Sequence, residues 1–415
     1  EYGYDDLCAN FNEEYKDKGL QVEYVRYVND DNGNLQLETY LMGGGDVDLF
    51  IGYGGRTKMD KRVDSNLLLD MSGMLNDIGF NLDDELGVAN MAEYHYDDGA
   101  VYGFPTKYEN SRWILINEDM FKEAGLDIPY DGWTYSEFLA DAEKLTHGEG
   151  QDKVYGVCWA RKQSGKSILY ALDGVLGANQ IYKNEEGTEV NFDNDVYRAG
   201  LNLVKETLDK GYAIPIEDEF SEDISVANTF LQGKCAIMLG VAQMRLCMDQ
   251  ENYPHDFMTA LVPAPVPDDE KYNTEFYRKQ IGTTGAGDLL SISANTKYPE
   301  ASFEFAMWYL KGGMSPLVQG GRIPLWNGVN KDEVLGVLKE KAQGSIDMDS
   351  MENYLSLDTT QGVAAIKGHA SSEISSAWFE EFDAMCYGKQ SVDQTVQNME
   401  KRGNELIQTE LSSQK

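Results

Sequence analysis

The sequence predicts an α/β fold divided between two domains. Short apolar runs typical of strands alternate with longer amphipathic runs typical of helices along the chain. The chain has 415 residues, of which 42% are hydrophobic, and it is too long for one comfortable core. No apolar run approaches the length that spans a membrane, so these residues are available to fill cores. The alternation of the two kinds of run also predicts largely parallel sheets.

Six runs have the pattern of half-buried or buried strands. In the second run, Val47, Leu49 and Ile51 alternate onto one face, and in the fourth Tyr155, Val157 and Trp159 do the same. The predicted strands cover residues 20–28, 46–54, 111–117, 153–159, 233–242 and 289–294.

The predicted helices have recognisable starts and ends. Thr134 and Glu137 have the spacing of a capping box, and Trp133 and Phe138 have that of a hydrophobic staple, which gives Trp133 a structural role. The apolar stripe of a later helix includes Trp308, which we expect in the core. Further start and stop signals are Asn117 and Gly125 for one helix, Gly211 and Pro215 for another, Pro299 for a third, and Ser391 with Gln394 for the last.

Composition excludes several classes of partner and site. The formal charge is −36, from 35 basic and 71 acidic residues, so nucleic acid and anionic lipid are not expected as partners. The five cysteines show no CxxC spacing and lie mostly in apolar runs, which predicts buried thiols rather than a disulfide framework. The four histidines have no helical metal-ligand spacing, so we expect neither a metal nor a cofactor.

The first residues begin almost at once on a helix, with Leu7, Phe11 and Tyr15 at intervals of four. A mature or trimmed chain has this form.

Four segments in a fixed order carry a resemblance to a known family. They are LETYLMGGGDVDLFIG at 37–52, the stretch from GAVYGFPTKYEN to AEKLT at 99–146, ANTFLQGKCAIMLG at 227–240, and LLSISANTKYPEASFEFAMWYL at 289–310. Together they resemble the extracellular solute-binding proteins of ABC importers. The branch they resemble most is the maltose-binding-protein-like one, which serves oligosaccharide importers.

The resemblance implies two α/β lobes joined by a hinge, as in periplasmic binding proteins. The expected N-terminal lobe comprises residues 1–109 and 286–327, and the expected C-terminal lobe comprises residues 110–285 and 328–415. A small-molecule ligand, an oligosaccharide, would bind in the cleft and favour the closed form. The protein would be a monomer without enzymatic activity that delivers its ligand to ABC permease subunits. It would be extracellular and held on the outer face of the membrane as a lipoprotein, or alternatively periplasmic.

A polar string, TKYENSR, stands where the family has its first crossing between lobes. Glu109, Asn110 and Arg112 are therefore expected to face the ligand. Sugar hydroxyls both donate and accept hydrogen bonds, and carboxylate, amide and guanidinium groups together match that pattern. A solvated polar turn is the alternative interpretation.

Ligands of open α/β sheets lie beyond the carboxyl ends of the strands, which selects further residues without the family. Tyr53 and Arg56 come after DVDLFIG, the apolar part of one predicted strand, and Trp159 and Arg161 lie at the end of another. The indole of Trp159 could lie against the apolar face of a pyranose ring while Arg161 reaches the hydroxyls at its rim.

Three more candidates come from loops and from the family pattern. Trp326 lies in a glycine-flanked loop, as a cleft wall or a packed loop residue, and Trp378 is either a stacking residue or helix core. Gln243 is the nearest polar group beside Ala242, which stands where the family has a tryptophan. Asp288 stands where the family has glycine and is not included among the candidates.

Two other functions stay open. An acidic glycoside hydrolase would use paired carboxylates, whose spacing a sequence does not show. The same fold could also bind a non-sugar solute such as a peptide or a polyamine. The six tryptophans and 25 tyrosines favour carbohydrate.

Overall fold

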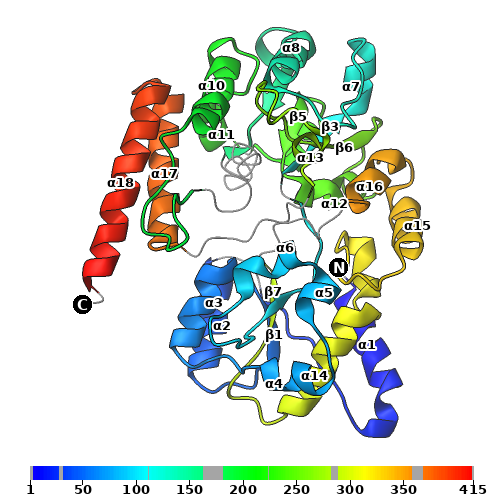
Figure 1. Ribbon diagram of the computed structural model, residues 1–415. Coiled ribbons are helices and arrows are strands. Elements are labelled where there is room, and N and C mark those ends of the chain that lie inside the picture. Colours follow the sequence, from blue (N-terminus) through cyan, green and yellow to red (C-terminus); the bar gives the residue numbers. More distant parts are fainter. Residues whose placement is uncertain are drawn as a thin grey trace. The chain divides into compact units, whose positions relative to one another are not determined.

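The chain is described by a computed structural model that divides into two compact units (Figure 1). Unit 1 comprises Glu1–Glu109 with Thr284–Leu338, and unit 2 comprises Asn110–Thr283 with Lys339–Lys415. The third change of unit along the chain falls inside helix α15 (Lys331–Ala342), whereas the sequence placed it after residue 327. The described residues are 3–27, 31–110, 112–161, 181–222, 224–281, 288–357 and 368–413.

Unit 1 contains a three-stranded sheet in the order β1-β7-β2. The strands are β1 (Leu49–Gly52), β2 (Phe104–Pro105) and β7 (Leu289–Ile292), and β7 runs antiparallel to both neighbours. Gly52 and Pro105 both pair with Leu289, so the carboxyl ends of β1 and β2 meet the start of β7 at one edge of the sheet.

The helices of unit 1 bury one face each against this sheet or against one another. In α1, Leu7 and Phe11 are buried, and the ring of Phe11 packs edge-on against Phe305 of α14 at 5.0 Å between centroids. Burying a side chain of this size contributes about 1.5–3 kcal/mol. The helices are α1 (Tyr4–Glu14), α2 (Asp31–Met42), α3 (Gly55–Asp64), α4 (Ser72–Asp77), α5 (Leu82–Leu86), α6 (Val88–Met91) and α14 (Pro299–Trp308).

The strand predicted over residues 20–28 is not formed, since residues 21–27 run without regular structure. Tyr27 nevertheless donates its hydroxyl to the carbonyl of Ile51 at 2.6 Å. The segment therefore lies against β1 through side chains rather than through a strand ladder.

Unit 2 contains a four-stranded sheet in the order β4-β5-β3-β6. Among the described strands, only β4 and β5 pair in parallel, while β3 runs antiparallel to both β5 and β6. The prediction of largely parallel sheets is therefore wrong, because alternation with helices does not fix the direction in which a strand enters its sheet. The strands are β3 (Trp113–Asn117), β4 (Tyr155–Cys158), β5 (Cys235–Leu239) and β6 (Thr259–Pro263).

Helix α8 (Tyr135–Leu145) begins as its sequence predicts. Glu137 N–H donates to Thr134 Oγ1 at 3.3 Å, and Thr134 N–H donates to Glu137 Oε2 at 2.7 Å, which confirms the capping box. The rings of Trp133 and Phe138 lie 5.0 Å apart, as a staple requires. Strand β4 packs closely on this helix, since a Cβ at Gly156 would come within 2.2 Å of the carbonyl of Ala142.

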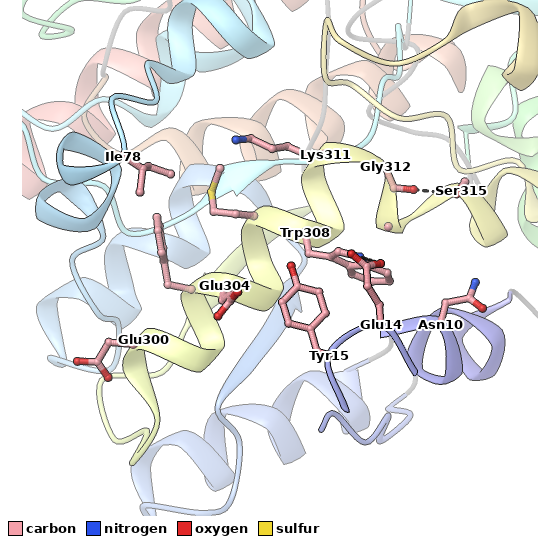
Figure 2. A pocket seen from close by; sticks show the side chains of 13 residues that line it. Asn10, Glu14, Tyr15, Ile78, Glu300, Glu304, Trp308, Lys311, Gly312 and Ser315 are labelled. Atoms are coloured by element: carbon pink, nitrogen blue, oxygen red, sulfur yellow. Dashed lines mark hydrogen bonds between the residues drawn. The ribbon is translucent and has the colours of Figure 1, made fainter. Parts of the chain in front are cut away.

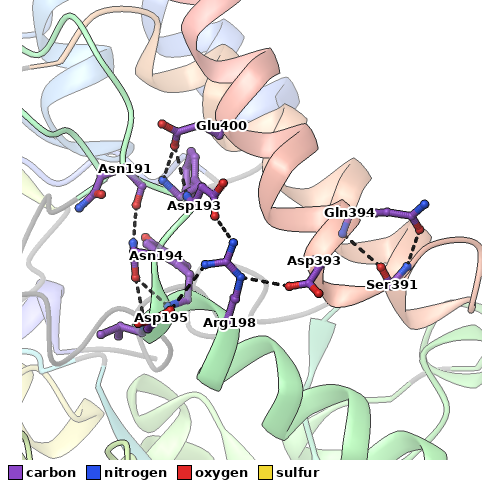
Figure 3. Close-up of polar contacts among 12 residues, drawn as sticks. Asn191, Asp193, Asn194, Asp195, Arg198, Ser391, Asp393, Gln394 and Glu400 are labelled. Carbon is purple, nitrogen blue, oxygen red and sulfur yellow. Dashed lines mark hydrogen bonds and ion pairs between the residues drawn. The ribbon is translucent and has the colours of Figure 1, made fainter.

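Helices α10 (Asp195–Asp209) and α18 (Val392–Ser413) are tied together by polar contacts near their first turns (Figure 3). Arg198 donates to Asp393 Oδ1 at 3.1 Å and pairs with Asp193. Glu400 accepts from the backbone N–H of Phe192 at 2.8 Å. The Ser391–Gln394 capping box is confirmed by bonds of 2.9 and 3.2 Å.

The remaining helices complete unit 2. They are α7 (Glu118–Glu123), α11 (Ile216–Ser221), α12 (Met244–Cys247), α13 (Glu275–Arg278), α16 (Met348–Leu355) and α17 (Ser371–Cys386). No helix among the residues that the structure describes is long and apolar enough to cross a membrane.

Asp141→Asn in α8 is expected to stabilise the protein at neutral pH. Desolvation, with Glu137 and Asp127 nearby, raises the pKa of Asp141 to about 6. The folded state therefore binds more protons than the unfolded state between about pH 4 and 6, and stability falls as pH rises through that window. A shift of this size on a fully buried group corresponds to about 3 kcal/mol, and because Asp141 is only partly buried we expect a gain of about 1 kcal/mol.

Thermal unfolding of both proteins from pH 4 to 8 measures this effect. The stability difference between the variant and the native chain should grow from near zero at pH 4 to its full value above pH 7. A difference that is constant with pH would contradict the assignment to this carboxyl.

Candidate functional site

Charged side chains gather in unit 1 where β1 and β2 end and β7 begins. Lys107 and Glu109 follow β2, and Asp288 directly precedes β7. Backbone bonds from Tyr108 N–H to the carbonyl of Ile323, at 2.8 Å, place Arg322 beside them. We call Lys107, Glu109, Asp288 and Arg322 the strand-end cluster.

Asp288 lies at the centre of the strand-end cluster. Its Oδ2 is 3.2 Å from Lys107 Nζ and 3.2 Å from a terminal nitrogen of Arg322. Lys107 Nζ is also 2.6 Å from Glu109 Oε2, and Arg322 donates to the hydroxyl of Tyr53 at 3.2 Å. The four charged side chains are 13–20% exposed, so each is largely buried but still reachable.

The strand-end cluster is electrically balanced, with two cations and two carboxylates. Burial alone would lower the pKa of Lys107, but the nearby carboxylates of Glu109 and Asp288 raise it above its usual value. The pKa of Arg322 is also raised, because Tyr4 and Asp288 outweigh its desolvation. Both cations therefore stay charged, and the cluster offers donors and acceptors together.

Tyrosines surround this cluster. The rings of Tyr4 and Tyr24 stack at 4.5 Å with an angle of 6°, and the guanidinium of Arg322 lies 5.9 Å from the ring of Tyr4. The rings of Tyr27 and Tyr53 meet edge-to-face at 6.1 Å. Tyr24 is 39% exposed, so it has accessible aromatic surface.

Of the residues that the sequence nominated, Tyr53 and Glu109 lie at this cluster, whereas its other members were not among the candidates. Asp288 precedes a predicted strand, and its place at the functional edge depends on β7 running antiparallel. Arg322 and Tyr4 carry no local signal, because their position depends on pairing with distant parts of the chain.

Arg56 does not face a ligand from the end of β1, which corrects the sequence-based expectation. Its Nε donates to Asp60 at 2.6 Å, and a terminal nitrogen donates to the carbonyls of Glu93 and His95 at 2.7 and 2.9 Å. The guanidinium also lies 3.8 Å from the ring of Tyr96. Nε and this terminal nitrogen of the Arg56 guanidinium therefore donate to partners within unit 1.

Trp326 is a packed loop residue of unit 1. Its Nε1 donates to Glu85 Oε2 at 2.7 Å, which joins the loop to α5. A Cβ at Gly328 would come within 2.2 Å of the indole, so the loop folds back over the ring. The side chain remains partly exposed.

In unit 2, Asn110 and Arg112 lie at the edge of the sheet where β3 begins and where β5 and β6 end. They are 1% and 3% exposed. Asn110 accepts from the backbone N–H of Arg112 at 3.1 Å and donates to the carbonyl of Gln280 at 3.2 Å. These bonds shape the turn that leads into β3. Gln243, beyond β5, is partly exposed and accepts from Arg245 at 3.3 Å.

Trp159 lies in the interior of unit 2 and Arg161 is partly buried and ion-paired there, contrary to the expectation of an open sugar-binding face. Trp159 is 2% exposed, and its Nε1 donates to Thr207 of α10 at 2.9 Å. Its ring packs on Phe138 of α8 at 5.8 Å. Arg161 makes a two-bond contact with Asp383 of α17, at 2.8 and 2.9 Å. Both side chains connect β4 to the surrounding helices.

Trp378 is also a core residue. This is the second of the two interpretations that its sequence left open, a residue of the helix core. It is 1% exposed, stacks on Phe382 at 4.9 Å and meets Phe379 edge-to-face at 4.9 Å. These contacts pack the indole against two aromatic rings of α17 itself.

A separate pocket of about 910 Å³ lies in unit 1 between α1 and α14. Figure 2 shows Glu14 and Tyr15 from α1 on one side and Glu304 and Trp308 from α14 on the other. Trp308 is therefore not the core residue that its helical stripe predicted, since it is partly exposed and donates Nε1 to Glu14 at 2.8 Å.

The fold and the sheet edges define a class of protein that comparisons with known proteins identify. Residues 2–311 match the family model of the bacterial extracellular solute-binding proteins. The match covers most of the chain, so the protein belongs to this family.

Solved structures with the same fold span nearly the whole chain. A sugar transporter from Rhizobium etli in an open conformation matches with a TM-score of 0.72 at 17% identity, over 97% of this chain and 95% of that one. An ABC substrate-binding protein from Listeria monocytogenes, in complex with cycloalternan, matches with a TM-score of 0.71 at 17% identity, with coverage of 97% and 95%. UgpB from Mycobacterium tuberculosis, in complex with glycerophosphocholine, matches with a TM-score of 0.71 at 17% identity, with coverage of 99% and 95%.

The chain is thus an extracellular solute-binding protein of an ABC transporter with a two-lobed α/β fold. The family and its structural neighbours are binding proteins. Family membership implies a small-molecule ligand and ABC permease partners.

Proposed function

We propose that the protein captures a neutral carbohydrate, in particular an oligosaccharide, through the strand-end cluster of unit 1 and delivers it to an ABC permease. The observation that carries this proposal is the balanced charge of the cluster beside accessible tyrosine surface. A sugar needs both donors and acceptors for its hydroxyls and an apolar surface for its ring faces. The cluster and Tyr24 offer both.

The structural neighbours support a carbohydrate but do not restrict the ligand to one. The Listeria protein was solved with cycloalternan, and a receptor from Streptomyces glaucescens was solved with acarbose. UgpB was solved with glycerophosphocholine, so the same fold also holds a zwitterionic, non-sugar solute.

The charge balance argues against a polyamine. A ligand with several ammonium groups needs an excess of carboxylates, and the two carboxylates of the cluster already neutralise Lys107 and Arg322. The same pairing argues against a hydrolase, because Glu109 and Asp288 both form ion pairs with Lys107, whereas a glycoside hydrolase directs two carboxyl groups at its substrate.

A thermal-shift screen tests the proposal. The panel contains neutral oligosaccharides of several linkages, spermidine, a tripeptide and glycerophosphocholine. A ligand at a hundred times its dissociation constant stabilises by about 2.7 kcal/mol, which corresponds to roughly 5–10 °C for a unit of this size. We expect such a shift with at least one neutral oligosaccharide.

A shift with only spermidine, the peptide or glycerophosphocholine would contradict the carbohydrate proposal. Product analysis after incubation with the tightest oligosaccharide tests the proposed lack of catalysis, since steady release of shorter sugars would indicate a hydrolase. The monomeric state and the lipid anchor stay predictions.

A further inference from the structure

Two of the charges in the strand-end cluster would attract an anion if a third group did not occupy the space between them. Lys107 Nζ and Arg322 are each 3.2 Å from the same oxygen, Asp288 Oδ2. This is the arrangement that a bound carboxylate or sulfate would adopt between a lysine and an arginine. Here the carboxylate belongs to the protein.

The position of Asp288 is fixed by the fold. It directly precedes Leu289, which pairs with Gly52 of β1 and Pro105 of β2 at the edge of the sheet. Lys107 and Arg322 come from adjacent segments, because residues 106–108 pair with residues 323–325. The side chain of Asp288 is 13% exposed, so bulk solvent screens its charge less than that of a surface carboxylate.

We infer that Asp288 determines the charge selectivity of the unit 1 site, by acting as an internal anion that excludes acidic solutes and leaves the site selective for neutral ones. This inference rests on the proposed function and specifies the substrate class as uncharged sugars. Glu109 makes a smaller contribution, because its ion pair is with Lys107 alone and it is the more exposed of the two carboxylates, at 20% against 13%.

The test removes the internal anion without changing its shape. Asp288→Asn leaves two cations and one carboxylate, a formal charge of +1, at the site. The probes are D-galacturonate and inorganic sulfate, titrated by calorimetry at low ionic strength. We expect Asp288→Asn to bind both anions on the order of tenfold to a hundredfold more tightly than the native protein.

Three further variants separate this effect from a general change of charge. Asp64→Asn removes the same formal charge from the exposed end of α3 and should leave anion binding unchanged. Glu109→Gln should give a smaller gain than Asp288→Asn. Combining Lys107→Met with Asp288→Asn should abolish the gain, because it restores neutrality at the site.

Equal anion affinity in Asp288→Asn, Asp64→Asn and the native protein would overturn the inference, as would tight anion binding by the native protein. If Asp288→Asn does not fold, the native titration and the Glu109→Gln titration decide: a gain in Glu109→Gln supports the inference, and no gain overturns it.

The outcome is separate from that of the proposed function. If no neutral oligosaccharide binds the native protein while Asp288→Asn gains anion binding, the carbohydrate proposal fails and the charge selectivity stands. If a neutral oligosaccharide binds the native protein and Asp288→Asn gains no anion binding, the carbohydrate proposal stands and the charge selectivity fails.

Discussion

Trp159→Ala is expected to lower the free energy of unfolding by about 3–5 kcal/mol, the usual cost of deleting a core tryptophan. The indole is 2% exposed between α8 and α10, and its removal also leaves Thr207 Oγ1 without the bond it accepts. Ligand affinity of the protein that remains folded should change little. Denaturant unfolding and calorimetric titration measure the two effects separately.

A graded series sharpens this test. Trp159→Phe keeps an aromatic ring but loses the bond to Thr207, so its cost should be lower than that of alanine. Tyr298→Ala, at a residue that is 62% exposed, should change stability by less than about 0.5 kcal/mol. An unchanged stability of Trp159→Ala, together with a large loss of affinity, would restore the ligand-facing interpretation.

Arg322→Met is expected to weaken binding of the tightest neutral oligosaccharide by about tenfold to 150-fold. A hydrogen bond to a charged group contributes about 1.5–3 kcal/mol, and about 1.4 kcal/mol corresponds to a tenfold change in affinity. The variant also removes one of the two cations that hold Asp288. Calorimetric titration gives the affinity, and the melting temperature of the unliganded protein reports any loss of fold.

Arg56→Met is the matched control for Arg322→Met. Both arginines belong to unit 1 and lose the same charge, but the donors of Arg56 are used by Asp60 and by the carbonyls of Glu93 and His95. Arg56→Met should therefore lower stability and leave affinity unchanged. Equal losses of affinity in the two variants would contradict the assignment of the site to the strand-end cluster.

Local signals predicted the parts of the fold that depend on neighbours in sequence. The capping box at Thr134 and the staple at Trp133 identified the start of α8, because both partners of each contact lie within five residues. The direction of β3 and β7 could not be predicted in this way. It depends on where the chain enters each sheet, which the alternation of strands and helices leaves open.

The difference between local and long-range contacts also explains where the site candidates from the sequence lie in the structure. The strand-end rule selected Tyr53, which accepts a hydrogen bond from Arg322 of the cluster, and also Arg161, whose guanidinium is bound within unit 2. Arg161 is bound by Asp383, 222 residues further along the chain, and no local pattern reveals that partner. An arginine or tryptophan at a strand end is thus a candidate until its long-range partners are known.

The placement of β7 between β1 and β2 has a consequence for how the chain acquires its structure during synthesis. The four strands described in unit 2 come from residues 113–263, so their sheet can assemble as soon as that stretch has left the ribosome. The first segment of unit 1, Glu1–Glu109, emerges earliest, yet β1 and β2 have no common partner until Leu289–Ile292 arrives. Closing so long a loop is slow, and the edges of β1 and β2 stay unpaired in the meantime. The earlier half of the chain is therefore the part that most needs protection from aggregation before synthesis is complete.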